Sequence, residues 1–239
     1  MIVFLLSNLN TNIALKSKFV EFRPMLVQLR SQYNSLHPYG WNDEGMIKAK
    51  GIQTMARVGV YTRIGPLHIQ FMPEHVNAEN APYEISDEFG SIPKDRFQQN
   101  FLGQSSVRLN LSAVSIGFSN ENIYWGPGQY GALIMSNNAP GFAHYTFNSI
   151  RPVKTFLGSF EFQLVTGRLE QDPSAPFEQI SLKTFSVWKE PRIFNGLNIV
   201  FQPKIFPNLF IGINRAYQYS EVNLAQQGNG FVDKFLPVF

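Results

Sequence analysis

Residues 52–64 read Ile-Gln-Thr-Met-Ala-Arg-Val-Gly-Val-Tyr-Thr-Arg-Ile, a stretch in which apolar and polar side chains alternate. Successive side chains of a β-strand point to opposite faces, so Val58 and Val60 share one face of this stretch. Arg57 and Arg63 then share the other face. An apolar face that recurs at every second residue indicates a strand rather than a helix. The stretch therefore predicts a fold built from β-strands.

The same alternation recurs along the chain of 239 residues. Gly65-Pro66 marks a turn, and residues 67–71 alternate again as the returning strand of a hairpin. Further strands are predicted at Ile2–Leu6, Phe19–Arg30, Val107–Leu111, Val114–Phe118, Phe160–Leu164, Ile180–Lys189, Leu197–Ile199 and Leu209–Ile213. We therefore expect an all-β protein, an antiparallel up-and-down meander of about nine or ten strands in one domain over residues 1–239.

Two long irregular segments interrupt the predicted strands. They run from Asn77 to about Gly103 and from Gly126 to about Ser149, and both are rich in Asn, Gly and Pro. Loops of this length are uncommon in compact domains and usually carry function. We expect short helical turns only in these two segments, and we look there for the functional residues.

Two architectures produce this alternation. In a soluble β-sandwich the polar face meets water, whereas in an outer-membrane barrel the apolar face meets lipid and the polar face lines the interior. The arginines of the polar faces suit an enclosed polar interior. For a barrel, the residues expected to point outward are Ile52, Val58, Val60, Leu67, Ile69, Phe71, Val107, Leu109 and Leu111. Those expected to point inward are Arg57, Arg63, His68, Arg108 and Asn110.

The composition argues against several classes of function. Lys+Arg is 20 against Asp+Glu 17, and a net charge of +3 is too small for a dedicated nucleic-acid binder. The absence of Cys excludes disulfide scaffolds, cysteine nucleophiles and thiolate metal sites. Aromatic residues make up 14% of the chain, which argues against intrinsic disorder. We expect no nucleic-acid partner.

Motifs for catalysis are equally scarce. Residues 126–131 match G-x-G-x-x-G, but no helix follows, and the position where an acidic residue is needed is Arg151. The histidines form no H-E-x-x-H motif, and no serine-hydrolase elbow is present. Loop carboxylates such as Asp43 and Glu44 could serve a glycosidase only at a defined separation. We expect no catalytic residues, no metal and no cofactor.

Aromatic and amide side chains gather at the start of the second irregular segment and within it. The candidate ligand-binding residues are Tyr124, Trp125, Asn137, Asn138 and His144. A flat ring covers the apolar face of a sugar, while an amide bonds the sugar hydroxyls. The same side chains also suit a structural role. We expect residues 124–138 to fold against the sheet as an ordered loop, with direct sugar contact as the alternative.

A family resemblance rests on these residues. Residues 120–128 (Asn-Glu-Asn-Ile-Tyr-Trp-Gly-Pro-Gly) and 133–142 (Leu-Ile-Met-Ser-Asn-Asn-Ala-Pro-Gly-Phe) resemble the hallmark block of the capsule assembly Wzi family. Residues 37–43 and 50–53 are similar to the upstream region of the family, and residues 158–161 fit downstream. The Trp-Gly-Pro-Gly and Ser-Asn-Asn-Ala-Pro pair is specific at this spacing.

The resemblance implies an outer-membrane β-barrel with lectin-like behaviour. Such a protein would hold capsular or other surface polysaccharide at the cell surface and contact outer-membrane lipid, without enzymatic activity; we expect a monomer. Family members carry a cleavable signal and continue well beyond the equivalent of Phe239. We therefore expect this chain to be roughly the N-terminal half of a barrel whose closing strands are missing. The alternatives are a soluble β-rich enzyme acting on glycans and a soluble β-sandwich carbohydrate-binding module.

Overall fold

A computed structural model describes residues 3–6, 15–17, 19–83, 96–128, 130–170 and 190–222. The elements of this described part are all strands: β1 (Val3–Leu6), β2 (Leu15–Lys16), β3 (Val20–Pro24), β4 (Gln28–Tyr39), β5 (Ala49–Arg57), β6 (Val60–Ile64), β7 (Leu67–Phe71), β8 (Glu74–Ala78), β9 (Phe97–Phe101), β10 (Ser106–Leu111), β11 (Val114–Ser119), β12 (His144–Ser149), β13 (Val153–Lys154), β14 (Gly158–Leu169), β15 (Arg192–Pro203) and β16 (Ile211–Ser220). The predicted strand Ile180–Lys189 lies outside the described residues.

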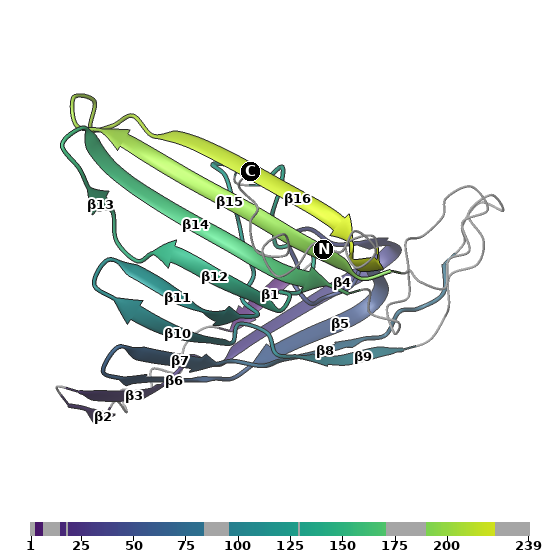
Figure 1. Ribbon diagram of the computed structural model, residues 1–239. Helices are drawn as coiled ribbons and strands as arrows, with labels where there is room; N and C mark the ends of the chain where they lie inside the picture. The colour runs from purple at the N-terminus through teal and green to yellow at the C-terminus, as the bar shows by residue number, and fades with distance from the viewer. Residues whose placement is uncertain are drawn as a thin grey trace.

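The strands form two antiparallel sheets that follow the chain as a meander (Figure 1). The 5-stranded sheet has the order β1-β4-β5-β8-β9. The 11-stranded sheet has the order β16-β15-β14-β12-β11-β10-β7-β6-β3-β2, with β13 beside β14. Among the described strands, the edge strands β16 and β2 do not pair with each other, so the sheet does not close. The predicted all-β up-and-down meander is confirmed.

The two sheets are successive parts of one curved wall. β3 leads into β4, β5 into β6, β7 into β8 and β9 into β10, each across a short break. Hydrogen bonds span these breaks: the amide of Met25 donates to the carbonyl of Gly59 (2.8 Å), and that of Gln104 to the carbonyl of Met72 (3.0 Å). The predicted single strand 52–64 is thus interrupted at Val58-Gly59.

The alternation of faces survives this interruption. Arg57 is 7% exposed and its neighbour Val58 is 60% exposed, so the two side chains lie on opposite faces as predicted. Arg63, His68 and Arg108 are direct cross-strand neighbours on β6, β7 and β10, and all are half-buried. The predicted outward residues that are exposed are Ile52, Val58, Val60, Phe71, Val107, Leu109 and Leu111, while Leu67 and Ile69 are half-buried.

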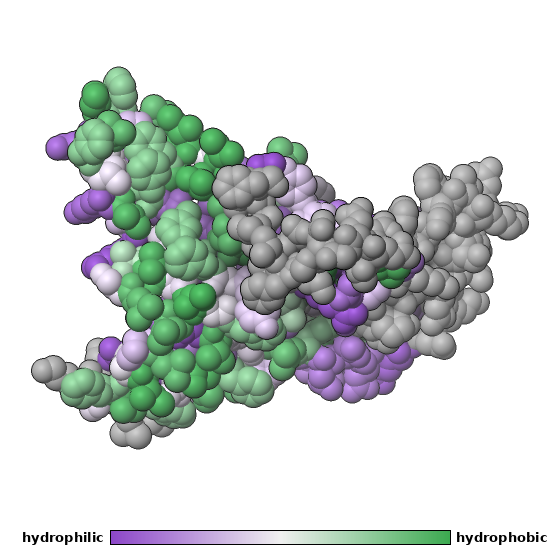
Figure 2. All heavy atoms as spheres, in the orientation of Figure 1, coloured by the Kyte–Doolittle hydropathy of each residue, from purple (hydrophilic) through white to green (hydrophobic). Residues whose placement is uncertain are grey.

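The polarity of the two faces reverses at β8 and β9, which lie at one edge of the smaller sheet. In the larger sheet, the outer face carries exposed apolar side chains such as Ile116 and Phe118. On β8 and β9, Val76 and Phe97 are buried on the inner side, while His75 and Gln98 lie outward. Figure 2 shows this change as an apolar region over β6, β7, β10 and β11 and a polar region over β8 and β9. We call these regions the apolar band and the polar extension.

The connections also differ between the two ends of the wall. Residues 65–66 and 112–113 are tight turns at the end that carries the apolar band. Long connections lie at the opposite end, where residues 40–48 join β4 to β5 and residues 120–143 join β11 to β12. We call residues 40–48 the first loop and residues 120–143 the second loop; residue 129 of the latter lies outside the described part.

The buried apolar residues form two clusters beneath these loops. The first contains Met46, Ala49, Met55, Val76, Ala78 and Phe97. The second contains Ile123, Trp125, Val165 and Phe194. The apolar core therefore lies at the long-loop end, where the loops fold onto the inner face of the sheets.

Both irregular segments are shorter than the sequence predicts. The segment 77–103 contains the end of β8 and all of β9, and the segment 126–149 contains β12. β9 reads Phe-Gln-Gln-Asn-Phe and has no apolar residue between its ends. Polar side chains face outward on β8 and β9, and this hides the alternation on which the prediction depended; β12 instead exposes Tyr145 and Phe147 and has no such explanation.

Candidate functional site

The first and second loops meet through a set of hydrogen bonds. The indole Nε1 of Trp41 and the side-chain amide of Asn42 both donate to the carbonyl of Tyr130. The backbone amide of Asn42 donates to Oδ1 of Asn138 (2.8 Å), and that of Glu44 donates to the carbonyl of Asn137 (2.7 Å). The two loops thus form a single surface at this end of the molecule.

Trp125 anchors the second loop to the inner face of the wall. Its ring is 4% exposed, and its Nε1 donates to Oε1 of Gln163 on β14 (2.7 Å). The ring centroid lies 6.3 Å from that of Phe194 on β15. A Cβ at Gly196 would overlap the Trp125 ring, so the absence of a side chain there permits this close approach. These contacts support the structural role rather than direct sugar contact.

The other predicted site residues are distributed between buried and accessible positions. His144 is buried, and its Nδ1 lies 2.7 Å from the carbonyl of Phe142. Tyr124 is half-buried and donates its hydroxyl to the carbonyl of Gly128. Asn137 is half-buried, and Asn138 is exposed at the contact between the loops. Of the five candidates, Asn138 is the most accessible.

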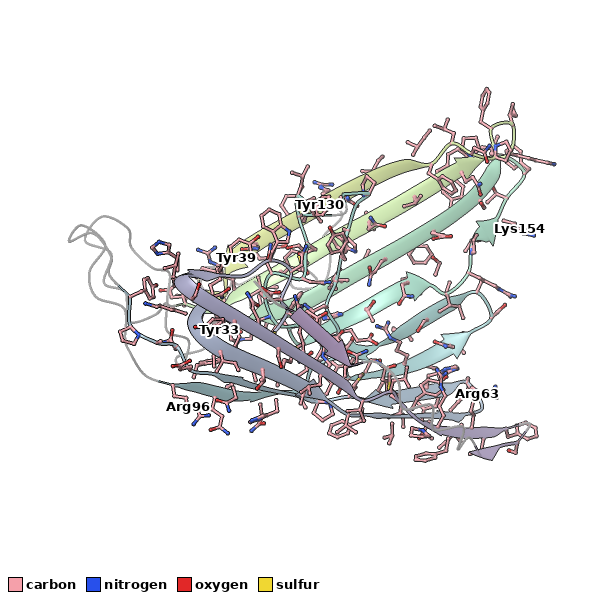
Figure 3. All side chains as sticks on the ribbon, turned by 180° about the vertical axis from the view of Figure 1, so that it is seen from behind. Tyr33, Tyr39, Arg63, Arg96, Tyr130 and Lys154 are labelled. Carbon is pink, nitrogen blue, oxygen red and sulfur yellow. The ribbon has the colours of Figure 1, made fainter. Side chains whose placement is uncertain are left out.

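Three aromatic residues that were not predicted as site residues lie at or beside the contact between the two loops. Trp41 is 51% exposed, Tyr130 is 78% exposed, and Tyr39 lies at the end of β4 beside the first loop. Figure 3 shows Tyr39 and Tyr130 in the same part of the molecule. We call Tyr39, Trp41 and Tyr130 the aromatic cluster. An aromatic ring next to an amide side chain, the pattern that suggested the candidate residues, also occurs at Trp41-Asn42. This pattern could have identified Trp41 from the sequence.

Arginines on β4 and β5 hold the first loop in place. Arg57 pairs with Glu44 of the loop and with Glu74 of β8, the latter at 3.1 Å between Nη2 and Oε1. Arg30 pairs with Asp43 and also donates to the carbonyl of Asn42. Both loop carboxylates are thus engaged in ion pairs, an arrangement that stabilises the loop.

A second polar network holds the start of the second loop. Arg108 pairs with Glu121, and Gln70 donates to the same carboxylate (3.2 Å). Gln104 donates to Oε1 of Glu74 (3.1 Å) and to Oδ1 of Asn122 (2.7 Å), and so joins the two networks. Four carboxylates of the predicted irregular segment 77–103, Glu84, Asp87, Glu88 and Asp95, lie outside the described residues. No cluster of three His, Asp or Glu side chains suited to a metal occurs in the described residues.

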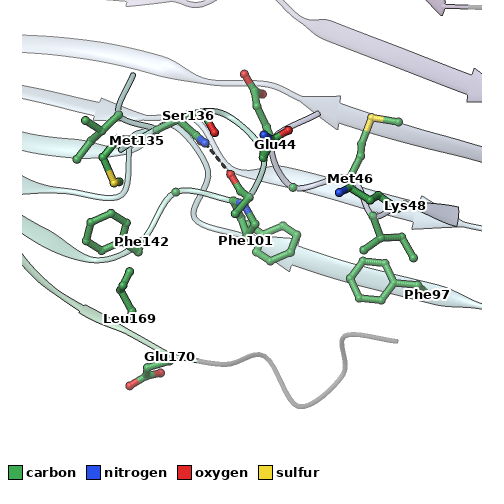
Figure 4. Close-up of a pocket in the computed structure, with 18 residues that line it drawn as sticks. Glu44, Met46, Lys48, Phe97, Phe101, Met135, Ser136, Phe142, Leu169 and Glu170 are labelled. Carbon is green, nitrogen blue, oxygen red and sulfur yellow. Dashed lines mark hydrogen bonds between the residues drawn. The ribbon is translucent and has the colours of Figure 1, made fainter. Parts of the chain in front are cut away.

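A cavity of about 580 Å³ lies between the two loops, β9 and the end of β14 (Figure 4). Its apolar lining includes Met46, Ile47, Phe97, Phe101, Ile123, Met135, Phe142 and Leu169. Its polar lining includes Glu44, Lys48, Asn122, Ser136, Asn138 and Glu170. Apolar walls with a few polar groups are the usual composition of a small-molecule site.

A meander with an apolar outer band, a polar inner face and long loops folded over one end has the architecture of an outer-membrane barrel wall. The sequence matches the family model described as capsule assembly protein Wzi over residues 31–225. The chain therefore belongs to the Wzi family of capsule assembly proteins, which are outer-membrane proteins. No curated protein and no solved structure matches the chain.

Within the described residues, no helix has the length and apolar character needed to cross a membrane.

Proposed function

We propose that this protein binds capsular or other surface polysaccharide through the aromatic cluster, without chemical turnover. The observation that carries the proposal is the exposure of Trp41 and Tyr130 at the point where the two loops join. Aromatic rings suit the apolar faces of sugars. Asn138 is exposed at the same contact, and its NH2 group can donate to a sugar hydroxyl.

The arrangement of the wall supports this location. In outer-membrane barrels, short turns face the periplasm, long loops face the exterior and an apolar band contacts lipid. The apolar band here lies toward the short turns, and the aromatic cluster belongs to the long-loop end. In this orientation the cluster faces the cell exterior, where surface polysaccharide is found.

The hydrogen bonds of the cluster favour binding by a preformed surface. The Trp41 indole donates to the carbonyl of Tyr130, and the carboxylate of Asp43 accepts from the Trp41 amide (2.6 Å). Arg30 in turn pairs with Asp43. A ring that is already held in position loses less conformational entropy when a sugar binds to it.

Ion pairing disfavours the alternative of a glycan-active enzyme. A general acid or base must have its carboxyl group within hydrogen-bond reach of the sugar on which it acts, and a carboxylate held in an ion pair is directed at its partner instead. Asp43 and Glu44, the described loop carboxylates nearest the cluster, both pair with arginine. Binding without turnover is therefore the better account of this site.

Substitution of Ile116 tests the contact between the apolar band and lipid. Ile116 is 53% exposed on the outer face of β11, and an arginine in the middle of a lipid-facing band costs about 2–4 kcal/mol. We expect Ile116→Arg to lower the yield of heat-resistant protein in outer membranes. Gln98→Arg, on the exposed face of β9 in the polar extension, serves as the matched control and should assemble normally. Equal yields of the two variants would contradict a lipid-facing band.

Substitution of the aromatic cluster tests polysaccharide binding. We expect Trp41→Ala and Tyr130→Ala each to weaken retention of isolated capsular polysaccharide by about tenfold, since exposed rings at the centre of an interface dominate its affinity. The measurement is equilibrium binding to the full-length protein in detergent. Tyr33→Ala removes a ring that is 52% exposed on the outer face of β4 and should bind as the unaltered protein does. Normal retention by both cluster variants would refute the proposed site.

A further inference from the structure

We propose that the cavity between the two loops binds an acidic sugar unit that carries a short acyl substituent. The inference rests on the proposed function and specifies it, because it assigns the polysaccharide a charge and a modification. The cavity is distinct from the aromatic cluster, but the first loop contributes to both.

The apolar walls of the cavity favour a ligand that carries an apolar group. Met135, Phe142 and Leu169 line one side, and Met46 and Phe97 line the other (Figure 4). A plain sugar unit presents mostly hydroxyl groups, and burying hydroxyls without hydrogen bonds is unfavourable. An acetyl or similar acyl group places a methyl against these walls and gains free energy from its burial. The volume of about 580 Å³ accommodates one or two sugar units.

One charged side chain of the lining, Lys48, is placed to contact an anionic group of the ligand. Three charged side chains line the cavity: Glu44, Lys48 and Glu170. Glu44 pairs with Arg57, and Glu170 pairs with Arg168. Lys48 is exposed, and in the described part of the chain no carboxylate forms an ion pair with it. Arg57 is shared with Glu74 and Arg168 with Glu221, so the ion pairs leave no surplus of positive charge, and the Lys48 ammonium is the lining group that can bind a sugar carboxylate.

Polar side chains that line the cavity still have hydrogen-bond donors and acceptors for an acyl sugar. Asn138 uses its Oδ1 to accept from the amide of Asn42, which leaves its NH2 group to donate to an acyl carbonyl. Ser136 can donate to or accept from a hydroxyl. Asn122 instead donates to the carbonyl of Ala139 (2.8 Å) and so belongs to the wall.

Lys48 also connects the cavity to the aromatic cluster. The position that a Cβ would occupy at Gly40 lies 3.3 Å from Cγ of Lys48, so the lysine stem passes beside the residue between Tyr39 and Trp41. A chain that stacks on Trp41 can therefore place a neighbouring unit at the mouth of the cavity.

The test uses the full-length protein and the isolated capsular polysaccharide of the producing strain. Three forms are compared by equilibrium binding: native, carboxyl-reduced and de-acylated. We expect each chemical modification to weaken binding by about tenfold, as loss of a charge-assisted contact or of a buried apolar group should. Native polysaccharide that binds no better than either modified form, or that contains no carboxylate or no acyl group, would overturn the inference.

Variants of Lys48 test whether the loss of binding after carboxyl reduction arises at this cavity. Lys48→Gln should weaken binding of the native form by about tenfold and leave binding of the carboxyl-reduced form unchanged. Lys48→Arg keeps the charge and should retain most of the affinity for the native form. If Lys48→Gln weakens both forms equally, Lys48 does not contact the carboxylate and the inference fails. Loss of all binding by the unaltered protein would instead refute the proposed function itself, so the two failures are distinguishable.

Discussion

Replacement of Trp125 by alanine is expected to destabilise the protein by about 3–5 kcal/mol, the usual cost of truncating a buried large aromatic side chain. The substitution removes the ring that packs against Gly196 and Phe194 and leaves Oε1 of Gln163 without its donor. The second loop should then lose its anchor on β14 and β15. Heat-resistant migration of the folded protein and denaturant unfolding in detergent measure the effect.

A conservative variant separates packing from hydrogen bonding at this position. Trp125→Phe keeps most of the buried apolar area and loses the indole donor, so it should cost only about 1–2 kcal/mol. Both variants should affect polysaccharide retention only to the extent that they affect folding. If Trp125→Ala assembled normally and lost retention, the structural role assigned to this ring would be wrong.

Replacement of Arg57 by methionine is expected to be destabilising to a similar degree, about 3–5 kcal/mol. Glu74 is 2% exposed, and without the guanidinium its carboxylate stays buried beside Glu44 with no compensating charge. Such a group is costly because the low-dielectric interior does not solvate it. The free energy of unfolding measures this destabilisation. Protease cleavage within the first loop measures whether the loop has detached from the sheet.

The double variant Arg57→Met/Glu74→Met provides the control for this pair. Removal of both charged partners eliminates the uncompensated charge, so the double variant should be more stable than Arg57→Met alone. Arg168→Ala provides a surface comparison, because Arg168 pairs with Glu170 and Glu221 at the surface and each such pair should contribute less than about 1 kcal/mol. A double variant no more stable than the single one would show that the buried charge is not the cause.

The sequence predicted the strands of the apolar band because their outer face is uniformly apolar. Apolar residues recur at alternate positions along Val58–Val60, Leu67–Phe71, Val107–Leu111 and Val114–Phe118. β8 and β9 were missed because the polarity of the wall reverses there. Their apolar residues face inward, and amides such as Gln98 face outward, so the strands resemble a polar loop.

The site was predictable only in part. The ordered second loop followed from its glycines, its proline and the two adjacent aromatic residues. The aromatic cluster did not, because Trp41 and Tyr130 are 89 residues apart in the sequence and meet only through the fold. Likewise, the ion pairs of the first loop join it to arginines of β4 and β5. The register that brings these arginines close to the loop cannot be derived from a local sequence pattern.

The break between β5 and β6 restricts how the length of this chain can change during evolution. Val58 and Gly59 occupy the break, and because they are two residues, Arg57 and Arg63 remain on the same face. Loss or gain of a single residue there would turn Arg63 outward and Val60 inward, since one step reverses every side chain of a strand. Insertions and deletions at this junction should therefore occur in pairs among descendants of the sequence, whereas the long loops can vary one residue at a time.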